Sequence, residues 1–129
     1  MQADIADSER LAVFVFHSNE MKEDAVHWRA FLPGKDGERS LFRVDGLDYY
    51  EIAAIGQECA AARPNEKLQG WAIISAADVR KLQGLQLKAD NTPPRHGFID
   101  TWPDDKNDRR ILAMSLADVA ATTRFPCAP

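Results

Sequence analysis

The sequence predicts an α+β domain with a mixed, mostly antiparallel sheet of about five to six strands. Two longer helices and one short helix are expected to pack mainly on one face of this sheet. Three observations lead to this prediction: an apolar run at 11–16, a capped amphipathic helix at 48–62, and strands that do not alternate strictly with helices. The 129 residues suit one domain. We expect a flexible N-terminus over 1–10, the domain over 11–123 and a tail over 124–129.

The first part of the chain is expected to supply the centre of the sheet. Residues 11–16 (LAVFVF) are apolar throughout, which favours a strand buried on both faces. A second strand is expected at 30–32, before a Pro-Gly pair and a turn at 35–37 (KDG). Residues 39–45 (RSLFRVD) alternate as in a strand with two different faces. Together these segments predict a hairpin over about 28–45.

A helix is predicted at 48–62 because both its start and its apolar stripe fit helical geometry. Asp48 can cap the first turn, and Glu51 three residues later can complete a capping box. The apolar stripe consists of Ile52, Ile55, Cys59 and Ala62. Gly56 within the helix costs about 1 kcal/mol relative to alanine, which indicates close packing against a strand.

The second part of the chain is expected to add three strands and two helices. Strands are predicted at 68–74, 85–89 and 96–100 from their apolar or alternating patterns. Ser75, with an acidic residue three positions later, predicts a short capped helix after the first of these strands. A final helix is expected from about residue 104 to 123, because acidic residues and a proline precede its apolar stripe.

Composition narrows the classes of function. The net charge of −4 argues against a general nucleic-acid binder, although a local basic patch near Arg95, Arg109 and Arg110 stays compatible with it. Cys59 and Cys127 are too far apart for a zinc or redox motif. The first ten residues are acidic rather than basic and then apolar, and no apolar run approaches the ~20 residues needed to cross a bilayer. We therefore expect a cytoplasmic protein without membrane contact or cofactor.

The Pro-Arg-His segment at 94–96 is the most suggestive stretch for chemistry. His96 can act as an acid or base near neutral pH, and Arg95 can bind an oxyanion, as can Arg43 on the earlier strand. On a regular strand His96 and Asp100 lie about 13 Å apart, at ~3.3 Å per residue. The sequence therefore excludes a local His-Asp pair between these two residues.

His17 is a second candidate, because it follows the predicted central strand and strand ends commonly carry binding residues. If His17 met His96 across the sheet, the two histidines would resemble a phosphodiesterase-like pair. The charged residues after His17, namely Glu20, Glu23, Asp24 and His27, are of types that bind zinc or manganese. Their spacing matches no compact metal motif, so we expect a solvated loop and no metal.

The remaining candidate side chains are nucleophiles and aromatic residues. No serine nucleophile is predicted, because no Gly-x-Ser-x-Gly context surrounds Ser18, Ser40, Ser75 or Ser115. Cys59 is expected to be inert packing on its helix. Trp28 and Trp102, if exposed, would suggest anchors of a protein interface. Trp102 also precedes a proline at the expected helix start, where it can pack as a staple.

Two blocks resemble an uncharacterised family of small bacterial proteins. The first consists of Pro94-Arg95-His96, Ile99, Trp102-Pro103 and Lys106, and the second of Phe31-Leu32-Pro33, Leu41-Phe42-Arg43-Val44, Gly46-Leu47, Glu51-Ile52 and Ile55-Gly56. The resemblance covers most of the chain. It implies a bacterial, cytosolic, single-domain protein and transfers no activity or catalytic residue.

Two classes of function remain. The first and favoured one is a protein-binding or regulatory domain that acts with a partner protein or by self-association, marked by an exposed apolar patch at Trp28, Trp102 or the last helix. The alternative is a small enzyme or ligand-binding domain for a phosphate-bearing substrate such as a nucleotide or RNA. It would use His96 as acid or base and Arg95 with Arg43 as anion clamps, and it requires His17, Arg43 and His96 to converge in one pocket.

Overall fold

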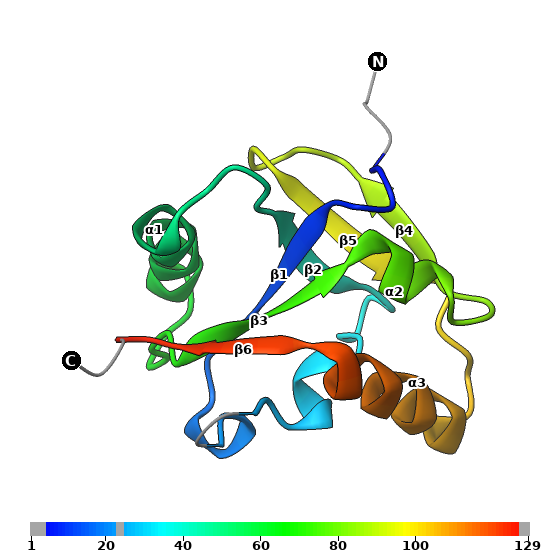
Figure 1. Cartoon of the computed structure of the whole chain (residues 1–129). Helices are drawn as coiled ribbons and strands as arrows, with labels where there is room; N and C mark the ends of the chain where they lie inside the picture. The colour runs from blue at the N-terminus through cyan, green and yellow to red at the C-terminus, as the bar shows by residue number, and fades with distance from the viewer. Residues whose placement is uncertain (1–4, 23–24, 127–129) are drawn as a thin grey trace.

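The α+β class is confirmed by the computed structural model, which describes residues 5–22 and 25–126 (Figure 1). Within these residues the chain forms one antiparallel six-stranded sheet, in the order β4-β5-β2-β1-β3-β6, with three α-helices. The strands are β1 (Arg10–Val15), β2 (Arg39–Arg43), β3 (Gly70–Ser75), β4 (Gln86–Ala89), β5 (His96–Asp100) and β6 (Ala121–Arg124). The helices are α1 (Tyr49–Ala61), α2 (Ala76–Arg80) and α3 (Lys106–Val119), preceded by the short 3-10 turns η1 (Ser18–Glu20) and η2 (Trp28–Phe31).

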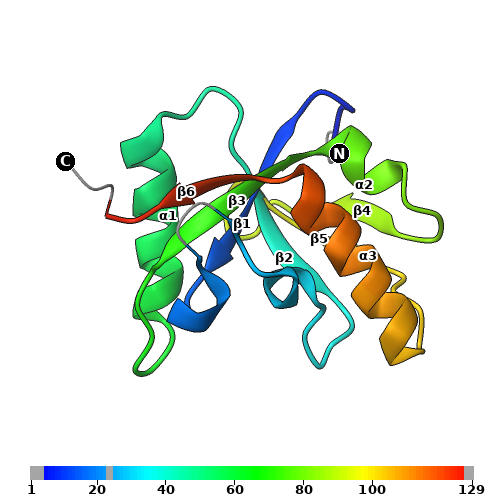
Figure 2. The ribbon, with the colours of Figure 1, turned by 60° about the horizontal axis from the view of Figure 1, so that its bottom comes forward.

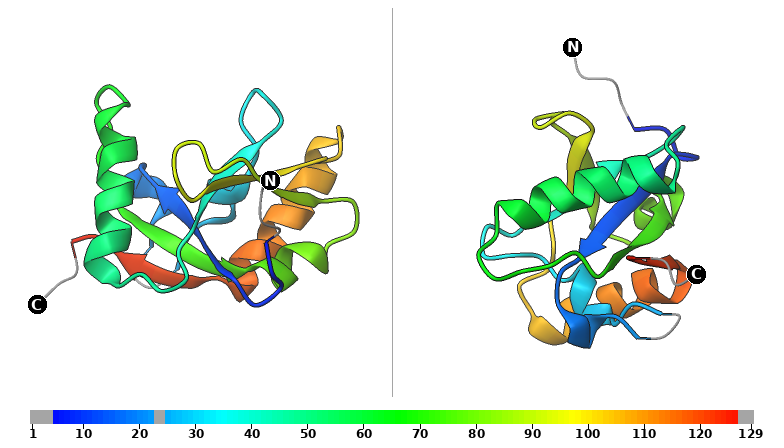
Figure 3. Two further views of the ribbon diagram at one scale, coloured as in Figure 1. Left: turned by 90° about the horizontal axis from the view of Figure 1, so that it is seen from above. Right: turned by 90° about the vertical axis from the view of Figure 1, so that its left-hand side faces the viewer.

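Helices cover both faces of the sheet. The larger hydrophobic cluster joins Leu11, Leu41 and Ile99 to Leu116 of α3 and to α2. The second cluster joins Phe42 and other strand residues to α1 on the opposite face. Two of the three helices therefore share a face as expected, while α1 lies on the other side (Figures 2 and 3). The reason is that consecutive residues of the central strands are apolar and point to opposite faces, so the sheet has two apolar faces rather than one.

β1 is the buried centre that the apolar run predicts. It pairs with β3 over six residues, from Arg10 opposite Ser75 to Val15 opposite Gly70. Its pairing with β2 covers only Leu11 and Ala12, opposite the end of β2. Beyond that point β1 and β2 diverge, which opens space at one end of the sheet.

Local capping signals are confirmed. The Asp48 side chain accepts a hydrogen bond from the Glu51 amide at 2.8 Å, and the Glu51 side chain accepts one from the Asp48 amide at 3.1 Å. Ser75 and Asp78 form the same reciprocal pair at the start of α2. Gly56 of α1 packs closely on the sheet, since a Cβ there would lie 2.8 Å from atoms of the Phe14 ring.

Two predicted elements are wrong. Residues 30–32 belong to η2 and its end instead of a strand, because Ala30 and Phe31 are buried under α3 in a single turn. The predicted hairpin over 28–45 therefore does not form, and β2 pairs with β1 and β5 instead. The final helix ends at Val119, and residues 121–124, expected to be helix and tail, form β6 on the free edge of β3 (Figure 1).

The segment before β1 contacts the body of the domain. Ile5 is buried, and Asp7 pairs with Arg80 of α2 at 2.6 Å. Glu9 forms a bidentate ion pair with Arg43, with N–O distances of 2.7 and 2.8 Å.

In the part of the chain that the structure describes, no helix combines the length and hydropathy needed to cross a bilayer.

Candidate functional site

Three polar side chains form a continuous hydrogen-bonded chain on the α1 side of the sheet. The Oδ1 atom of Asp90 lies 2.7 Å from Nδ1 of His96. The Nε2 atom of the same imidazole lies 3.1 Å from Oγ of Ser40. This order of carboxylate, imidazole and hydroxyl is the one that activates a serine as a nucleophile.

Strand pairing brings these residues together. β2 and β5 are antiparallel, with Phe42 opposite His96 and Ser40 opposite Phe98. Positions two apart on a strand share a face, so Ser40 and His96 are diagonal neighbours on the face that carries Phe42. Asp90 directly follows β4, in the connection that leads into β5.

This connection holds the carboxylate in place through its backbone. Asn91 donates its amide to the His96 carbonyl at 2.9 Å, and His96 donates its amide to the Pro93 carbonyl at 3.0 Å. Asn91 and Arg95 have positive φ angles of 54° and 72°. A positive φ is unfavourable for arginine, and such strained residues concentrate at functional sites.

The electrostatics keep Asp90 charged. Burial opposes ionisation of Asp90, but hydrogen bonds from His96 and from the Thr92 amide outweigh this effect and lower the pKa of the carboxyl. An ionised Asp90 accepts a proton-bearing Nδ1, which leaves Nε2 of a neutral His96 free to accept the Ser40 hydroxyl. In this tautomer Nε2 of His96 can act as a general base toward the Ser40 hydroxyl.

Packing orients the imidazole. The His96 side chain is only 15% exposed. Its ring lies edge-on to Phe42, with centroids 5.3 Å apart, and 6.4 Å from the ring of Phe98. Ser40, by contrast, is exposed. The base is thus held by aromatic neighbours while the hydroxyl is accessible.

Ser40 lines a polar pocket of about 390 Å³ where β1 and β2 diverge. Arg39 reaches into the gap, where its guanidinium donates to the carbonyls of Phe14 at 3.0 Å and Ala30 at 2.6 Å. Burial lowers the pKa of Arg39 to about 10. On the other side, Phe42 borders a mostly apolar groove of about 680 Å³. Ser40 thus borders the polar pocket, and Phe42, whose ring contacts that of His96, borders the apolar groove.

His17, Arg43 and His96 do not converge, although the phosphate-binding alternative requires it. Arg43 is bound to Glu9 and alternates with Phe42 on β2, so its side chain lies on the face opposite His96. His17 lies beyond the end of β1, where its Nε2 atom is 3.4 Å from a Glu66 oxygen. Neither residue reaches His96.

Arg95 directly precedes His96 in sequence, but it lines the apolar groove and not the polar pocket at Ser40. Its side chain is exposed and donates to the Arg43 carbonyl at 3.3 Å. With Pro93 and Pro94 it forms the wall of the apolar groove that faces α1. Arg95 can thus contact a ligand in that groove.

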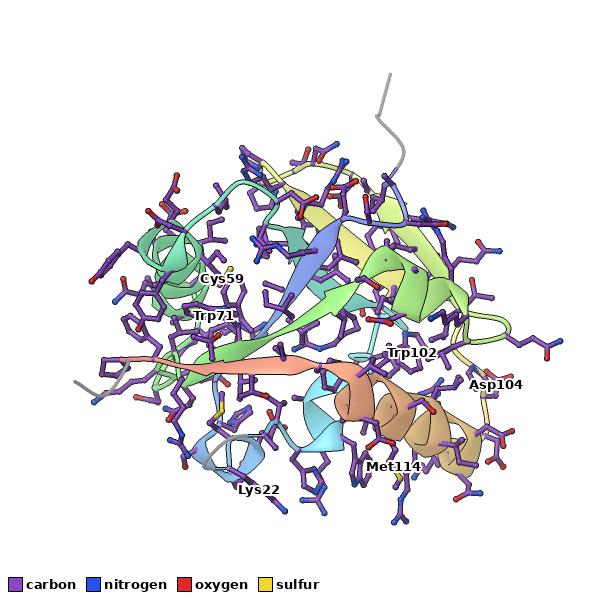
Figure 4. The ribbon with its side chains drawn as sticks, viewed as in Figure 1. Lys22, Cys59, Trp71, Trp102, Asp104 and Met114 are labelled. Atoms are coloured by element: carbon purple, nitrogen blue, oxygen red, sulfur yellow. The ribbon has the colours of Figure 1, made fainter. Side chains whose placement is uncertain are left out.

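The two tryptophan candidates differ. Trp102 is only 8% exposed, and its indole donates to the Ile99 carbonyl at 3.1 Å (Figure 4). The prediction of an interface anchor at Trp102 is therefore wrong, because this side chain belongs to the core. Trp28 is partly buried and lies beside the guanidinium of Arg110.

The candidate metal ligands are dispersed among the residues that the structure describes. There, no group of three His, Cys, Asp or Glu side chains is arranged to hold a metal ion. Glu23 and Asp24 lie outside the described residues, as does Cys127.

Burial raises the pKa of the Cys59 thiol, which makes it a poor nucleophile.

Sequence reasoning missed Ser40 and Asp90. Ser40 lacks the Gly-x-Ser-x-Gly context, and Asp90 is one of several turn residues before β5. The available signal was the strand alternation, which assigns Ser40 and Phe42 to one face and His96 and Phe98 to one face. That these two faces coincide depends on β2 and β5 being neighbours.

Compared with models of protein families, with curated proteins and with solved structures, the chain matches none of them.

Proposed function

We propose that the protein is a small enzyme that transfers or hydrolyses an acyl group, with Ser40 as the nucleophile. The observation that carries this proposal is the pair of hydrogen bonds that links Asp90, His96 and Ser40. The distance from Asp90 Oδ1 to His96 Nδ1 is 2.7 Å, and the distance from His96 Nε2 to Ser40 Oγ is 3.1 Å. The phosphate-binding alternative requires Arg43 as an anion clamp, but Arg43 is held in an ion pair with Glu9. The proposed function therefore differs from that alternative. His96 keeps the acid-base role that the sequence suggested.

The chemistry follows from the hydrogen bonds. As the Ser40 oxygen attacks the carbonyl carbon of an ester, its proton moves to Nε2 of His96. The resulting imidazolium is stabilised by the ionised Asp90. His96 then returns the proton to the departing alcohol, and a water molecule releases the acyl group from Ser40 by the same sequence of transfers.

The two recesses suggest the shape of the substrate. The apolar groove between α1 and the Pro93–Arg95 segment suits the hydrocarbon part of an ester. The polar pocket next to Ser40 suits a hydrophilic part. Their volumes, about 680 and 390 Å³, are in the range of small-molecule sites. We therefore expect a small ester with one apolar and one polar end.

A fluorophosphonate probe, which reacts with activated serines, tests the proposal. We expect covalent labelling of the wild-type protein at Ser40, located by peptide mass spectrometry, and none in Ser40→Ala. Ser115→Ala is the matched control, because Ser115 only donates to a carbonyl within α3. If the wild-type protein is not labelled, or if the label is found on another residue, Ser40 is not the nucleophile.

A second candidate function, the protein-binding role, is supported by the outer face of α3. Ile111, Met114 and Val119 are 54%, 42% and 54% exposed, although each is apolar. Met114 is labelled on α3 in Figure 4. This face would mediate self-association. Sedimentation equilibrium should show a concentration-dependent dimer that Ile111→Glu with Met114→Glu abolishes. A wild-type monomer at every concentration up to the millimolar range would remove this candidate.

A further inference from the structure

A groove of about 540 Å³ lies between η2 and the first turns of α3. It is on the face of the sheet opposite the Ser40 site, since both η2 and α3 pack into the larger core cluster. We call it the Trp28 groove. It is lined by Trp28, Leu32, Pro33, Lys106, Asn107, Arg109 and Arg110. An apolar wall from η2 therefore faces a cationic wall from α3.

The groove is positive although the protein carries a net charge of −4. Three of its lining residues are cationic, and none of the described lining residues is acidic. Among the described residues, no carboxylate forms an ion pair with Lys106, Arg109 or Arg110. The nearby Asp105 is used as the N-cap of α3, where it accepts the Asp108 amide. The cationic wall thus forms no ion pair with a carboxylate of the described structure, although Asp104, Asp105 and Asp108 belong to the same stretch of sequence.

His27, next to Trp28 in sequence, lies near several cationic side chains. The pKa of His27 is lowered, first by burial and then by the positive charges of Arg29, Lys22 and, more weakly, Arg110. Glu20 opposes the effect without reversing it. Of these causes only Arg110 lines the groove, and its effect on the pKa of His27 is the weakest of them.

The guanidinium groups are held ready for an anion. The Arg110 guanidinium lies 5.2 Å from the centre of the Trp28 ring, within cation-π range. Stacking occupies the plane of a guanidinium and leaves its N–H edges free to bind an oxyanion. Arg109 donates its Nε–H to the Pro103 carbonyl, which fixes the side chain and leaves its terminal amino groups available.

We propose that the Trp28 groove binds a small organic anion that joins an apolar or aromatic body to a phosphate or carboxylate group. The body lies against Trp28, Leu32 and Pro33, and the oxyanion is bound by the side chains of the α3 wall. A volume of about 540 Å³ suits a small molecule. The proposal is independent of the Ser40 chemistry.

Four probes separate the contributions: 1-naphthyl phosphate, 1-naphthoate, 1-naphthol and inorganic phosphate. The readout is the indole N–H signal of each of the three tryptophans in a ¹⁵N-labelled protein. Trp71 and Trp102 are buried and serve as internal references for an intact fold. We expect one or both aromatic anions to shift the Trp28 signal selectively, which also identifies the preferred oxyanion. Naphthol and inorganic phosphate should bind at least ten times more weakly than the better anion.

Charge variants complete the test. Arg109→Gln with Arg110→Gln should weaken binding of the better anion at least tenfold. Lys67→Gln with Lys81→Gln removes the same charge at exposed positions outside the groove and should leave binding unchanged. Arg110→Gln alone, which keeps the Arg109 bond to Pro103, should weaken binding at least threefold and covers the case in which the double variant is unstable. Equal binding of naphthol, unchanged affinity in Arg110→Gln, or no shift of Trp28 with either anion would overturn the proposal.

Discussion

Replacing Asp90 with asparagine separates the proposed catalytic role from stability. Asn keeps the size of the side chain but removes the negative charge that stabilises a protonated imidazole. In the wild type one oxygen, Oδ1 of Asp90, contacts both the Thr92 amide and Nδ1 of His96. If the Asn amino group takes this position, it gives up the Thr92 bond and donates to Nδ1 of His96, which would place the imidazole proton on Nε2. The ring would then donate to Ser40 instead of accepting from it, so the hydroxyl would lose its base.

The structure sets two very different magnitudes for this change. The Asp90 side chain is 40% exposed, so its pairing with His96 contributes less than about 1 kcal/mol to folding. The wrong tautomer in a serine-histidine-aspartate arrangement lowers turnover by roughly 10⁴-fold. We therefore expect Asp90→Asn to reduce the fluorophosphonate labelling rate by at least about 10³-fold, while the free energy of unfolding changes by less than about 1 kcal/mol.

The assay compares labelling rates at pH 7.5 with urea unfolding of the same samples. Ser40→Ala sets the background rate. A labelling rate within threefold of the wild type would refute the role of Asp90 in setting the tautomer. A loss of several kcal/mol of stability together with slow labelling would instead make Asp90 a structural residue.

Two further predictions concern the scaffold. Hydrogen bonding from Arg43 lowers the pKa of Glu9 and outweighs burial, which would raise it. The ion pair therefore stabilises the folded state fully when the pH is above the ordinary glutamate pKa of 4.5. This stabilisation is lost as the pH falls through the lower pKa that Glu9 has in the folded protein. Glu9→Gln should cost about 1–3 kcal/mol at pH 7 and much less near pH 3 in urea unfolding; a pH-independent difference would contradict this assignment. Gly56→Ala should destabilise by about 1–3 kcal/mol, because its Cβ would lie 2.8 Å from Phe14 and Leu68 atoms. A stabilised Gly56→Ala variant would show that helix propensity outweighs this crowding.

The sequence by itself determined the features that depend on neighbours along the chain. The capping boxes at Asp48 and Ser75 are local, since each joins residues three positions apart. The apolar run at 11–16 indicated a buried central strand because no other position in a sheet hides both faces of a strand from water. These signals were sufficient for the α+β class.

Local signals failed where long-range contacts decided the outcome. Residues 30–32 have a strand-like composition, but burial under α3 favours the 3-10 turn of η2. Residues 121–124 continue a helical pattern, but the open edge of β3 offers backbone hydrogen bonds that only a strand can complete. In each case tertiary contacts outweighed a weak local preference.

The candidate site belongs almost entirely to the tertiary structure. His96 was recognisable from its residue type and its position at the start of a strand. Its partners were not, because Ser40 is 56 positions away and becomes a neighbour only when β2 pairs with β5. Alternation along one strand determines which side chains share a face, whereas the order of strands in the sheet determines which faces meet. That order follows from burial of the whole chain, and it placed Ser40 and Asp90 beside His96 while turning Arg43 to the opposite side.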